Sequence, residues 1–216
     1  MNSLETLGKP FPLGANVTPA GVNFSLFSRT ATGVDLLLFD REDDKNPIRT
    51  ISLDPVSNHT YHYWHTFVPN LRPGQLYGYR VIGPTDHAHG LRFDCTKVLL
   101  DPYGKGLVIP KNYSPEFARH PGDNTTTAMQ NVVVDSSAYD WQGDSPLLHP
   151  SARTVIYEMH LRGFTRHPNS GVGEKTRGTY AGLIEKIPYL QNLGITAVEL
   201  LPIFGFDPHA CPPGLV

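Results

Sequence analysis

The chain has 216 residues, of which 39% are hydrophobic and 18% charged, and its formal net charge at pH 7 is −2. This is the composition of an ordinary globular protein, and so small a net charge gives no electrostatic basis for binding nucleic acid or an anionic membrane. The apolar runs are too short to span a bilayer, and the first residues lack a basic segment followed by an apolar one. We therefore expect a cytoplasmic protein without a secretion signal, whose cysteines, Cys95 and Cys211, are free thiols.

Short strands separated by turn residues are predicted over the first half of the chain. Val22, Phe24 and Leu26 alternate with polar residues, which is typical of a strand with one buried face. Further strands are predicted at residues 34–39, 48–53, 63–68 and 76–82. Because no strong helical stretch interrupts them, residues 1–110 are predicted to form an antiparallel β-sandwich.

Residues 111–153 are irregular in pattern and are predicted to be a linker region that packs on a larger neighbour. One short strand is expected there, at residues 131–135. Trp141 is expected to order the end of this region by packing its side chain. The segment therefore separates two parts of the chain that have different periodicities.

A strand, a helix and a second strand are predicted from residue 154 onward. Residues 155–161 are strand-like, and Thr179 is a suitable N-cap for a helix that carries an apolar stripe. Pro188 is expected to kink this helix, and Gly194 to end it. The nearly continuous apolar run at residues 195–201 then predicts a buried parallel strand, so this part of the chain is a βαβ unit.

Several motifs resemble those of one known family. They are Gly21-Val22-Asn23-Phe24-Ser25-Leu26-Phe27-Ser28, Tyr77-Gly78-Tyr79-Arg80-Val81, Leu99-Leu100-Asp101-Pro102-Tyr103, Ile156-Tyr157-Glu158-Met159-His160-Leu161-Arg162-Gly163-Phe164-Thr165 and residues 177–202. Together they resemble the N-terminal part of an isoamylase-type glycogen or starch debranching enzyme of the α-amylase clan, a family-13 glycoside hydrolase preceded by a family-48 carbohydrate-binding module. The parent family hydrolyses α-1,6 branch linkages of glucans with retention.

The resemblance implies a mainly β fold in two parts. The sandwich of residues 1–110 is similar to the immunoglobulin-like module of these enzymes. Residues 154–216 are similar to the incomplete start of a TIM (β/α)8 barrel: its first strand, first helix and second strand. A complete barrel of this type needs about 250 residues.

No catalytic residue is predicted in this chain. A retaining glycosidase needs two carboxyl groups about 5 Å apart, and in the resembling family these come from later barrel strands. Glu158 and Glu199 lie in the middle of their predicted strands, away from the strand ends where barrel catalysis occurs, so we assign them structural roles. We expect the parent enzyme to be a debranching α-1,6-glucosidase and this polypeptide alone to be inactive. The alternative is a non-catalytic glucan-binding or accessory protein.

Binding of an α-glucan is the chemistry that remains, and the run Tyr61-His62-Tyr63-Trp64-His65 has the composition for it. Aromatic rings pack against the apolar faces of sugars. Strand alternation places Tyr61, Tyr63 and His65 on one face, and His62 and Trp64 on the other. These aromatic residues belong either to the core or to a glucan platform, for which Trp64 is the first candidate, followed by Tyr61 and Tyr63. Tyr77 and Tyr79 are assigned to the core.

Metals and cofactors are not predicted. The segment 171–176 has some likeness to a phosphate loop, but Glu174 breaks the required Gly-Lys step. His59, His62 and His65 are spaced by three, which in a strand sends the middle one to the opposite face and leaves no zinc site. Self-association is expected through the incomplete barrel, because unpaired strand edges and exposed apolar faces promote it.

Overall fold

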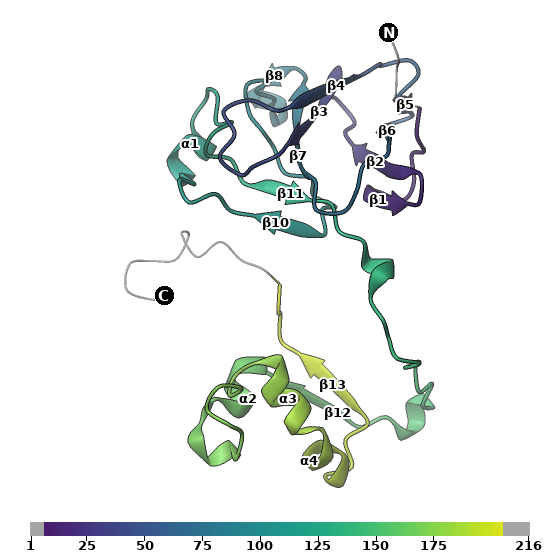
Figure 1. Ribbon diagram of the computed structural model, residues 1–216, viewed down its shortest axis with the longest axis vertical. Helices are drawn as coiled ribbons and strands as arrows, with labels where there is room; N and C mark the ends of the chain where they lie inside the picture. Colours follow the sequence, from purple (N-terminus) through teal and green to yellow (C-terminus); the bar gives the residue numbers. More distant parts are fainter. Residues whose placement is uncertain (1–6, 205–216) are drawn as a thin grey trace. The chain divides into compact units, whose positions relative to one another are not determined.

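The computed structural model describes residues 7–204 of the chain (Figure 1). These residues fall into two compact units, residues 7–139 and residues 140–204, and each unit is described by itself.

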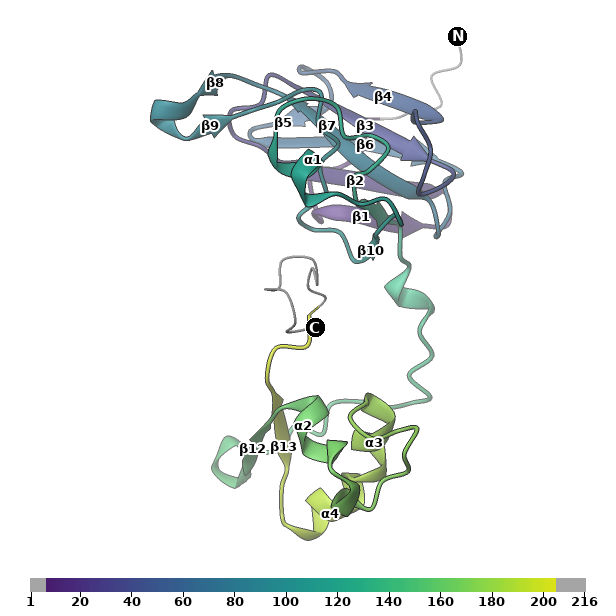
Figure 2. The same cartoon turned by 90° about the vertical axis from the view of Figure 1, so that its left-hand side faces the viewer.

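Two antiparallel sheets make up most of the first unit (Figures 1 and 2). The first has the strand order β1 (Gly14–Thr18), β2 (Gly21–Phe27), β6 (Tyr63–Pro69), β5 (His59–Thr60). The second has the order β10 (Gly106–Val108), β11 (Gln130–Val132), β7 (Leu76–Ile82), β3 (Gly33–Phe39), β4 (Arg49–Leu53). A small hairpin of β8 (Thr85–Asp86) and β9 (Leu91–Arg92), and the short helix α1 (Pro115–Arg119), lie outside these sheets. The predicted β-sandwich is therefore confirmed.

The main core lies between the two sheets, and the alternation in β2 places it there. Val22, Phe24 and Leu26 point inward and are buried, and Leu26 is the register partner of Trp64 on β6. The opposite sheet contributes Leu36, Leu38, Tyr77, Tyr79 and further apolar side chains to the same cluster. Phe24 and Tyr77 meet edge to face, with ring centroids 5.1 Å apart, an arrangement that stabilises aromatic pairs.

Strand β3 is buried on both of its faces, which explains why its sequence does not alternate. Leu37 and Phe39 point away from the main core and are fully buried in a second apolar cluster with Val98 and Ala128. These partners belong to the segment that follows β9, which covers the outer face of the second sheet. A strand enclosed on both faces reads as a continuous apolar run.

The first unit extends past the predicted end of the sandwich at residue 110. Strand β11 pairs with β7 and with β10, both antiparallel, so the predicted strand at 131–135 belongs to the second sheet. Asp101 ties the intervening chain to the core, because the hydroxyl of Tyr77 donates to its Oδ2 at 2.9 Å and the backbone N–H of Tyr103 to its Oδ1 at 2.8 Å. Burial raises the pKa of Asp101, an effect that these two hydrogen bonds partly offset.

Residues 7–13 cross the outer face of the first sheet as a strap held by polar side chains. The side chain of Asn23 accepts from Lys9 N at 2.7 Å and donates to Lys9 O at 3.0 Å. Ser25 Oγ donates to Pro10 O at 2.7 Å, and His65 Nδ1 lies 2.6 Å from Leu7 O. The strap thus covers Ser25 and His65, both buried, and satisfies their polar groups.

The second unit contains a parallel pair of strands joined by helices. Strand β12 (Ile156–Met159) pairs with β13 (Ala197–Leu200), with Glu158 opposite Glu199. The connection carries α2 (Leu161–Arg166), α3 (Tyr180–Glu185) and α4 (Ile187–Asn192). Short 3-10 turns stand at Ser151–Arg153 and Pro168–Ser170 in this unit, and at His87–His89 and Ser136–Ala138 in the first unit.

The start and the end of the helical segment between β12 and β13 were predicted correctly, but its continuity was not. Thr179 is the N-cap of α3, and its hydroxyl accepts the Gly182 N–H at 3.3 Å. Gly194, with φ +84°, follows α4 as predicted. The single helix that we predicted is instead two, broken at Lys186, with Pro188 in the first turn of α4 where a missing N–H costs nothing.

The strand predicted at residues 155–161 ends at Met159, because a helix that we did not predict begins there. His160 caps α2, and its Nδ1 accepts the N–H of Gly163 at 3.0 Å. The turn of the chain at this residue removes Leu161 from the strand.

Candidate functional site

Exposed and half-buried aromatic side chains gather at one end of the outer face of the first sheet. Phe27 on β2 and Tyr63 on β6 are register partners, and their rings meet edge to face with centroids 5.5 Å apart. The ring of His62 lies 6.0 Å from that of Phe27, and Tyr61 lies 3.8 Å from His62. We call Phe27, Tyr61, His62 and Tyr63 the aromatic patch.

A two-residue hairpin turn carries half of this patch. Thr60 pairs with Tyr63, so Tyr61 and His62 form the connection between β5 and β6. The N–H of Ser28 donates to His62 O at 2.9 Å and fastens the turn to the end of β2. Tyr61 has φ +58° and is 78% exposed. A bulky residue in the left-handed region is strained, and such strain is often found at binding sites.

The predicted site residues lie in different environments. Trp64 is only 1% exposed and stacks on His59, with centroids 4.4 Å apart and planes inclined by 24°. Its indole thus presents no face to solvent. Tyr61 and Tyr63 both belong to the aromatic patch, although Tyr61 reaches it from the turn and not through strand alternation. Tyr77 and Tyr79 are buried in the core, as predicted.

Sequence reasoning missed Phe27 as a member of the patch. Its position carried a signal, since an apolar residue directly after Leu26 is out of phase with the buried face of β2. The patch offers ring faces and phenol hydroxyls and contains no acidic or lysine or arginine side chain. Such a surface suits a neutral ligand that combines apolar faces with hydroxyl groups.

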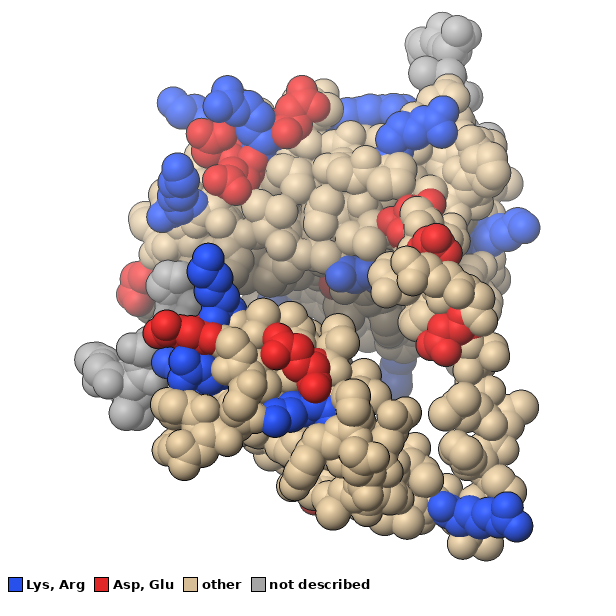
Figure 3. All heavy atoms as spheres, turned by 60° about the horizontal axis from the view of Figure 1, so that its bottom comes forward, with Lys and Arg blue, Asp and Glu red and all other residues tan. Residues whose placement is uncertain are grey.

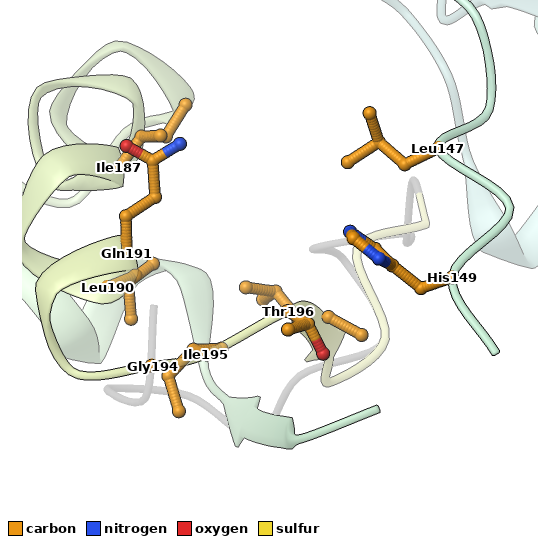
Figure 4. Close-up of a pocket in the computed structure, with 10 residues that line it drawn as sticks. Leu147, His149, Ile187, Leu190, Gln191, Gly194, Ile195 and Thr196 are labelled. Carbon is orange, nitrogen blue, oxygen red and sulfur yellow. The ribbon is translucent and has the colours of Figure 1, made fainter. Parts of the chain in front are cut away.

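An apolar hollow of about 380 Å³ lies in the second unit between α4 and β13 (Figure 4). Ile187 and Leu190 of α4 line one side, and Leu147 and His149 approach from the chain that precedes β12. Large apolar side chains elsewhere in this unit, such as Ile184, are exposed. The lining is mostly apolar, so the hollow has few polar groups that could orient a small ligand.

Glu158 and Glu199 stand opposite each other in the parallel pair, and both side chains are exposed. The sequence predicts positions in the middle of longer strands, whereas in the structure each is the third residue of a four-residue strand. Neither side chain is buried, so the pair lacks the enclosed apolar environment in which a glycosidase holds its general acid.

On the face that Figure 3 presents, Lys and Arg side chains lie beside Asp and Glu side chains in small groups, with uncharged areas between the groups. Within residues 7–204 no three His, Cys, Asp or Glu side chains are grouped as a metal site would require. In the same part of the chain, no helix is long and apolar enough to cross a membrane. Cys95 is an exposed free thiol, whereas Cys211 lies outside the described residues.

Part of the sandwich is similar to a known family. Residues 12–104 match the family described as "Carbohydrate-binding module 48 (Isoamylase N-terminal domain)". The match lies within the first unit.

The chain as a whole is homologous to isoamylases and glycogen debranching enzymes. It is 42% identical to the glycogen debranching enzyme of Serratia proteamaculans over 97% of its own length, and 44% identical to chloroplastic isoamylase 3 of rice over 93%. It spans 31% and 26% of those two proteins.

Solved structures give the same picture of the fold. The catalytic module of the pneumococcal glycogen-degrading virulence factor SpuA matches 93% of this chain and 28% of its own, with a TM-score of 0.66 and 25% identity. A pullulanase from Paenibacillus barengoltzii matches 94% of this chain and 29% of its own, with a TM-score of 0.67 and 23% identity.

Proposed function

We propose that this chain forms the N-terminal part of an enzyme that hydrolyses α-1,6 branch linkages of glycogen or a starch-like glucan. The observation that carries the proposal is identity of 40–44% to isoamylases and glycogen debranching enzymes over more than nine-tenths of the chain. The sandwich serves as the glucan-facing module, and the second unit belongs to the catalytic barrel.

The second unit is assigned as the first strand, the first helical connection and the second strand of a (β/α)8 barrel. Strands β12 and β13 are parallel and adjacent, and α2, α3 and α4 lie between them in the sequence. This is the repeating unit of such barrels. Exposed apolar side chains on α3 and α4, including Ile184 and Ile187, fit helices that pack against neighbouring barrel segments.

The 216-residue polypeptide by itself is proposed to be inactive as a hydrolase. Glu158 and Glu199 are exposed on an open pair of strands, where no enclosed site holds a sugar between them. The test is incubation of the purified chain with glycogen and measurement of reducing ends. Release of reducing sugar that disappears in Glu158→Gln or Glu199→Gln would overturn both this proposal and the structural role of these residues.

The aromatic patch is proposed as the surface with which the sandwich contacts an α-glucan. Its rings can pack against the C–H faces of consecutive glucose units, and the hydroxyls of Tyr61 and Tyr63 can bond to those of the sugar. Trp64 has an indirect role: it stacks on His59 and so stabilises the pairing of β5 and β6, the strands that the turn with Tyr61 joins.

Affinity electrophoresis in gels that contain glycogen tests this site. Tyr61→Ala and Tyr63→Ala should each reduce the glucan-dependent retardation several-fold. Tyr180→Ala is the matched control, because Tyr180 is an exposed tyrosine of the second unit. Unchanged retardation of both patch variants would remove the patch from the glucan-binding surface. Absence of retardation in the parent chain would favour a packing role for the sandwich.

We also propose that the isolated chain self-associates through apolar side chains of the second unit. Ile156 on β12 and Ile184 on α3 are 60% and 64% exposed, and exposed apolar faces of this kind promote association. Sedimentation velocity should show concentration-dependent association that Ile184→Asp weakens. Val56→Asp is the control, since Val56 is an exposed apolar residue of the first unit. A monomer at all concentrations would contradict the proposal.

A non-catalytic glucan-binding or accessory protein is the second candidate function, supported by the complete core of the sandwich. Glucan retardation by a chain that also stays monomeric would favour this candidate over the barrel assignment.

A further inference from the structure

The loops that follow β12 enclose a hollow whose chemistry differs from that of the aromatic patch. Its volume is about 540 Å³, and its lining consists of Gly163, Arg166, His167, Pro168, Glu174 and Arg177. No aromatic ring other than the imidazole lines it, so a sugar face has no platform there. Guanidinium groups are the main polar groups that it offers.

Both arginines lack an acidic partner. Among the described residues, neither Arg166 nor Arg177 forms an ion pair. The Nε of Arg177 is also shielded from solvent and has no hydrogen-bond partner in the described part of the chain. A shielded guanidinium donor without an acceptor is unfavourable unless a ligand or another chain segment supplies the acceptor.

Gly178 brings the basic side chains together. It has φ +75°, and its N–H donates to the buried hydroxyl of Thr165 at 2.8 Å, which fixes the loop on α2. A Cβ at this position would lie 3.2 Å from Cγ of Arg162 and 3.5 Å from Cδ of Arg166. The stems of these two arginines therefore pack along Gly178, directly beside Arg177.

His167 adds a third donor to the lining. The N–H of Asn169 donates to its Nδ1 at 3.2 Å, so in the neutral ring the proton is on Nε2. Glu174 is the one acid in the lining. The lining therefore has a net positive charge, because it contains two arginines and one carboxylate. The imidazole adds a further hydrogen-bond donor.

We propose that this hollow binds a phosphate group, either as inorganic phosphate or as the phosphate monoester of a sugar. Two guanidinium groups supply forked donors that match the oxygens of a tetrahedral anion, and such charge-assisted bonds are the strong ones. The volume exceeds that of phosphate alone and is within the range of small-molecule sites. The site is separate from the aromatic patch and does not depend on the debranching assignment.

Isothermal titration calorimetry of the whole chain tests the proposal with three probes: inorganic phosphate, glucose 6-phosphate and glucose. Saturable millimolar binding of either phosphate probe, with no response to glucose, is the expected result. Tighter binding of glucose 6-phosphate would identify a sugar phosphate as the ligand, and equal binding would identify the free anion. In parallel, the Nε–H resonance of Arg177 should shift on titration, a direct readout of the shielded donor.

Charge variants separate a built site from general attraction of anions. Arg177→Gln and Arg166→Gln should each weaken binding about tenfold, as the loss of one charge-assisted bond predicts. Glu174→Gln should strengthen it, because it removes the opposing carboxylate. Arg153→Gln, at an exposed arginine of the same unit outside the hollow, should have no effect.

Three results would overturn the proposal. They are the absence of saturable phosphate binding, an effect of Arg153→Gln as large as that of Arg177→Gln, and equally tight binding of acetate. If an arginine variant fails to fold, the Glu174→Gln variant still tests the proposal. Phosphate binding that is weaker than in the parent chain, or unchanged, in Glu174→Gln would contradict the assignment.

Discussion

The two units of this chain differ in how completely they hide their apolar side chains. The sandwich buries Trp64, Phe24 and Tyr77 between its sheets and a second cluster on the far face of β3. In the second unit the buried apolar residues are Met159, Val172 and Leu190, while Ile184 and Tyr180 are exposed. Both units have ordinary hydrophobic sequences, but a core needs a second layer to close it. The two sheets of the sandwich close its core, whereas the parallel pair and its helices leave large apolar side chains such as Ile156 and Ile184 exposed.

The largest expected effect is the loss of stability caused by a cavity in the core of the sandwich. Trp64→Ala should destabilise the sandwich by about 3–5 kcal/mol, because it removes a fully buried indole and its stacking on His59. Urea unfolding followed by circular dichroism measures the change. Tyr180→Ala, at an exposed tyrosine of the open unit, should change stability by less than about 0.5 kcal/mol. A similar loss of unfolding free energy in both variants would contradict the difference in apolar burial between the two units.

A smaller effect is expected at Asp101, the buried acid of the sandwich. Its pKa is raised in the folded protein, chiefly by burial, so the folded state holds its proton to higher pH than the unfolded state does. Its contribution to stability is therefore present below the ordinary pKa of 3.8 and is lost as the pH rises through the raised folded value.

Asp101→Asn removes this titration and retains groups for the bonds to Tyr77 and Tyr103. The urea midpoint of the variant should exceed that of the parent at pH 7, and the two should converge below pH 3.8. A midpoint that is lower than the parent's at pH 7 would show that the ionised carboxylate stabilises the core.

Tyr61→Gly tests whether the aromatic patch, unlike the core of the sandwich, lowers the stability of the fold. Glycine adopts the φ of +58° without strain, so the variant should be more stable by up to about 1 kcal/mol. Glucan retardation should fall at the same time. A loss of stability in urea unfolding would mean that the ring contact with His62 outweighs the backbone strain.

The smallest effect is expected in the open unit. Glu199→Gln removes the repulsion between facing, exposed carboxylates and should stabilise the unit by about 0.5 kcal/mol or less. Hydrogen exchange of the β12 and β13 amides measures it. Faster exchange in the variant would contradict the repulsive interaction and would point to a favourable role for Glu199.

Most of the sandwich could be predicted from alternation and apolar runs, because its longer strands turn at least one apolar face to the core. Strand β2 alternates over its length, and β7 was placed at its observed bounds. The pairing of β11 with β7 could not be predicted, since it depends on contacts across more than fifty residues. The break at Lys186 was missed for the opposite reason, because a proline in the first turn of a new helix leaves the apolar stripe intact.

The candidate site was predicted less well. Alternation fails at Tyr61 because the strand is interrupted by a two-residue turn. It placed Trp64 on the face opposite Tyr63 but did not tell which face is the core, so Trp64 was the first candidate for the platform although it is buried. The basic hollow depends on Gly178 lying against α2, a helix that the strand-like pattern before it concealed.

The burial of β3 on both faces has a consequence for how this protein can evolve. In β4, Thr50 and Ser52 are exposed and alternate with the buried Ile51 and Leu53, so random substitutions have alternate sites where they are tolerated. In β3 the positions from Leu36 to Phe39 are all enclosed. Sequence drift among related proteins should therefore be slowest across this block of adjacent residues, and the module should diversify mainly through the hairpin that displays Tyr61.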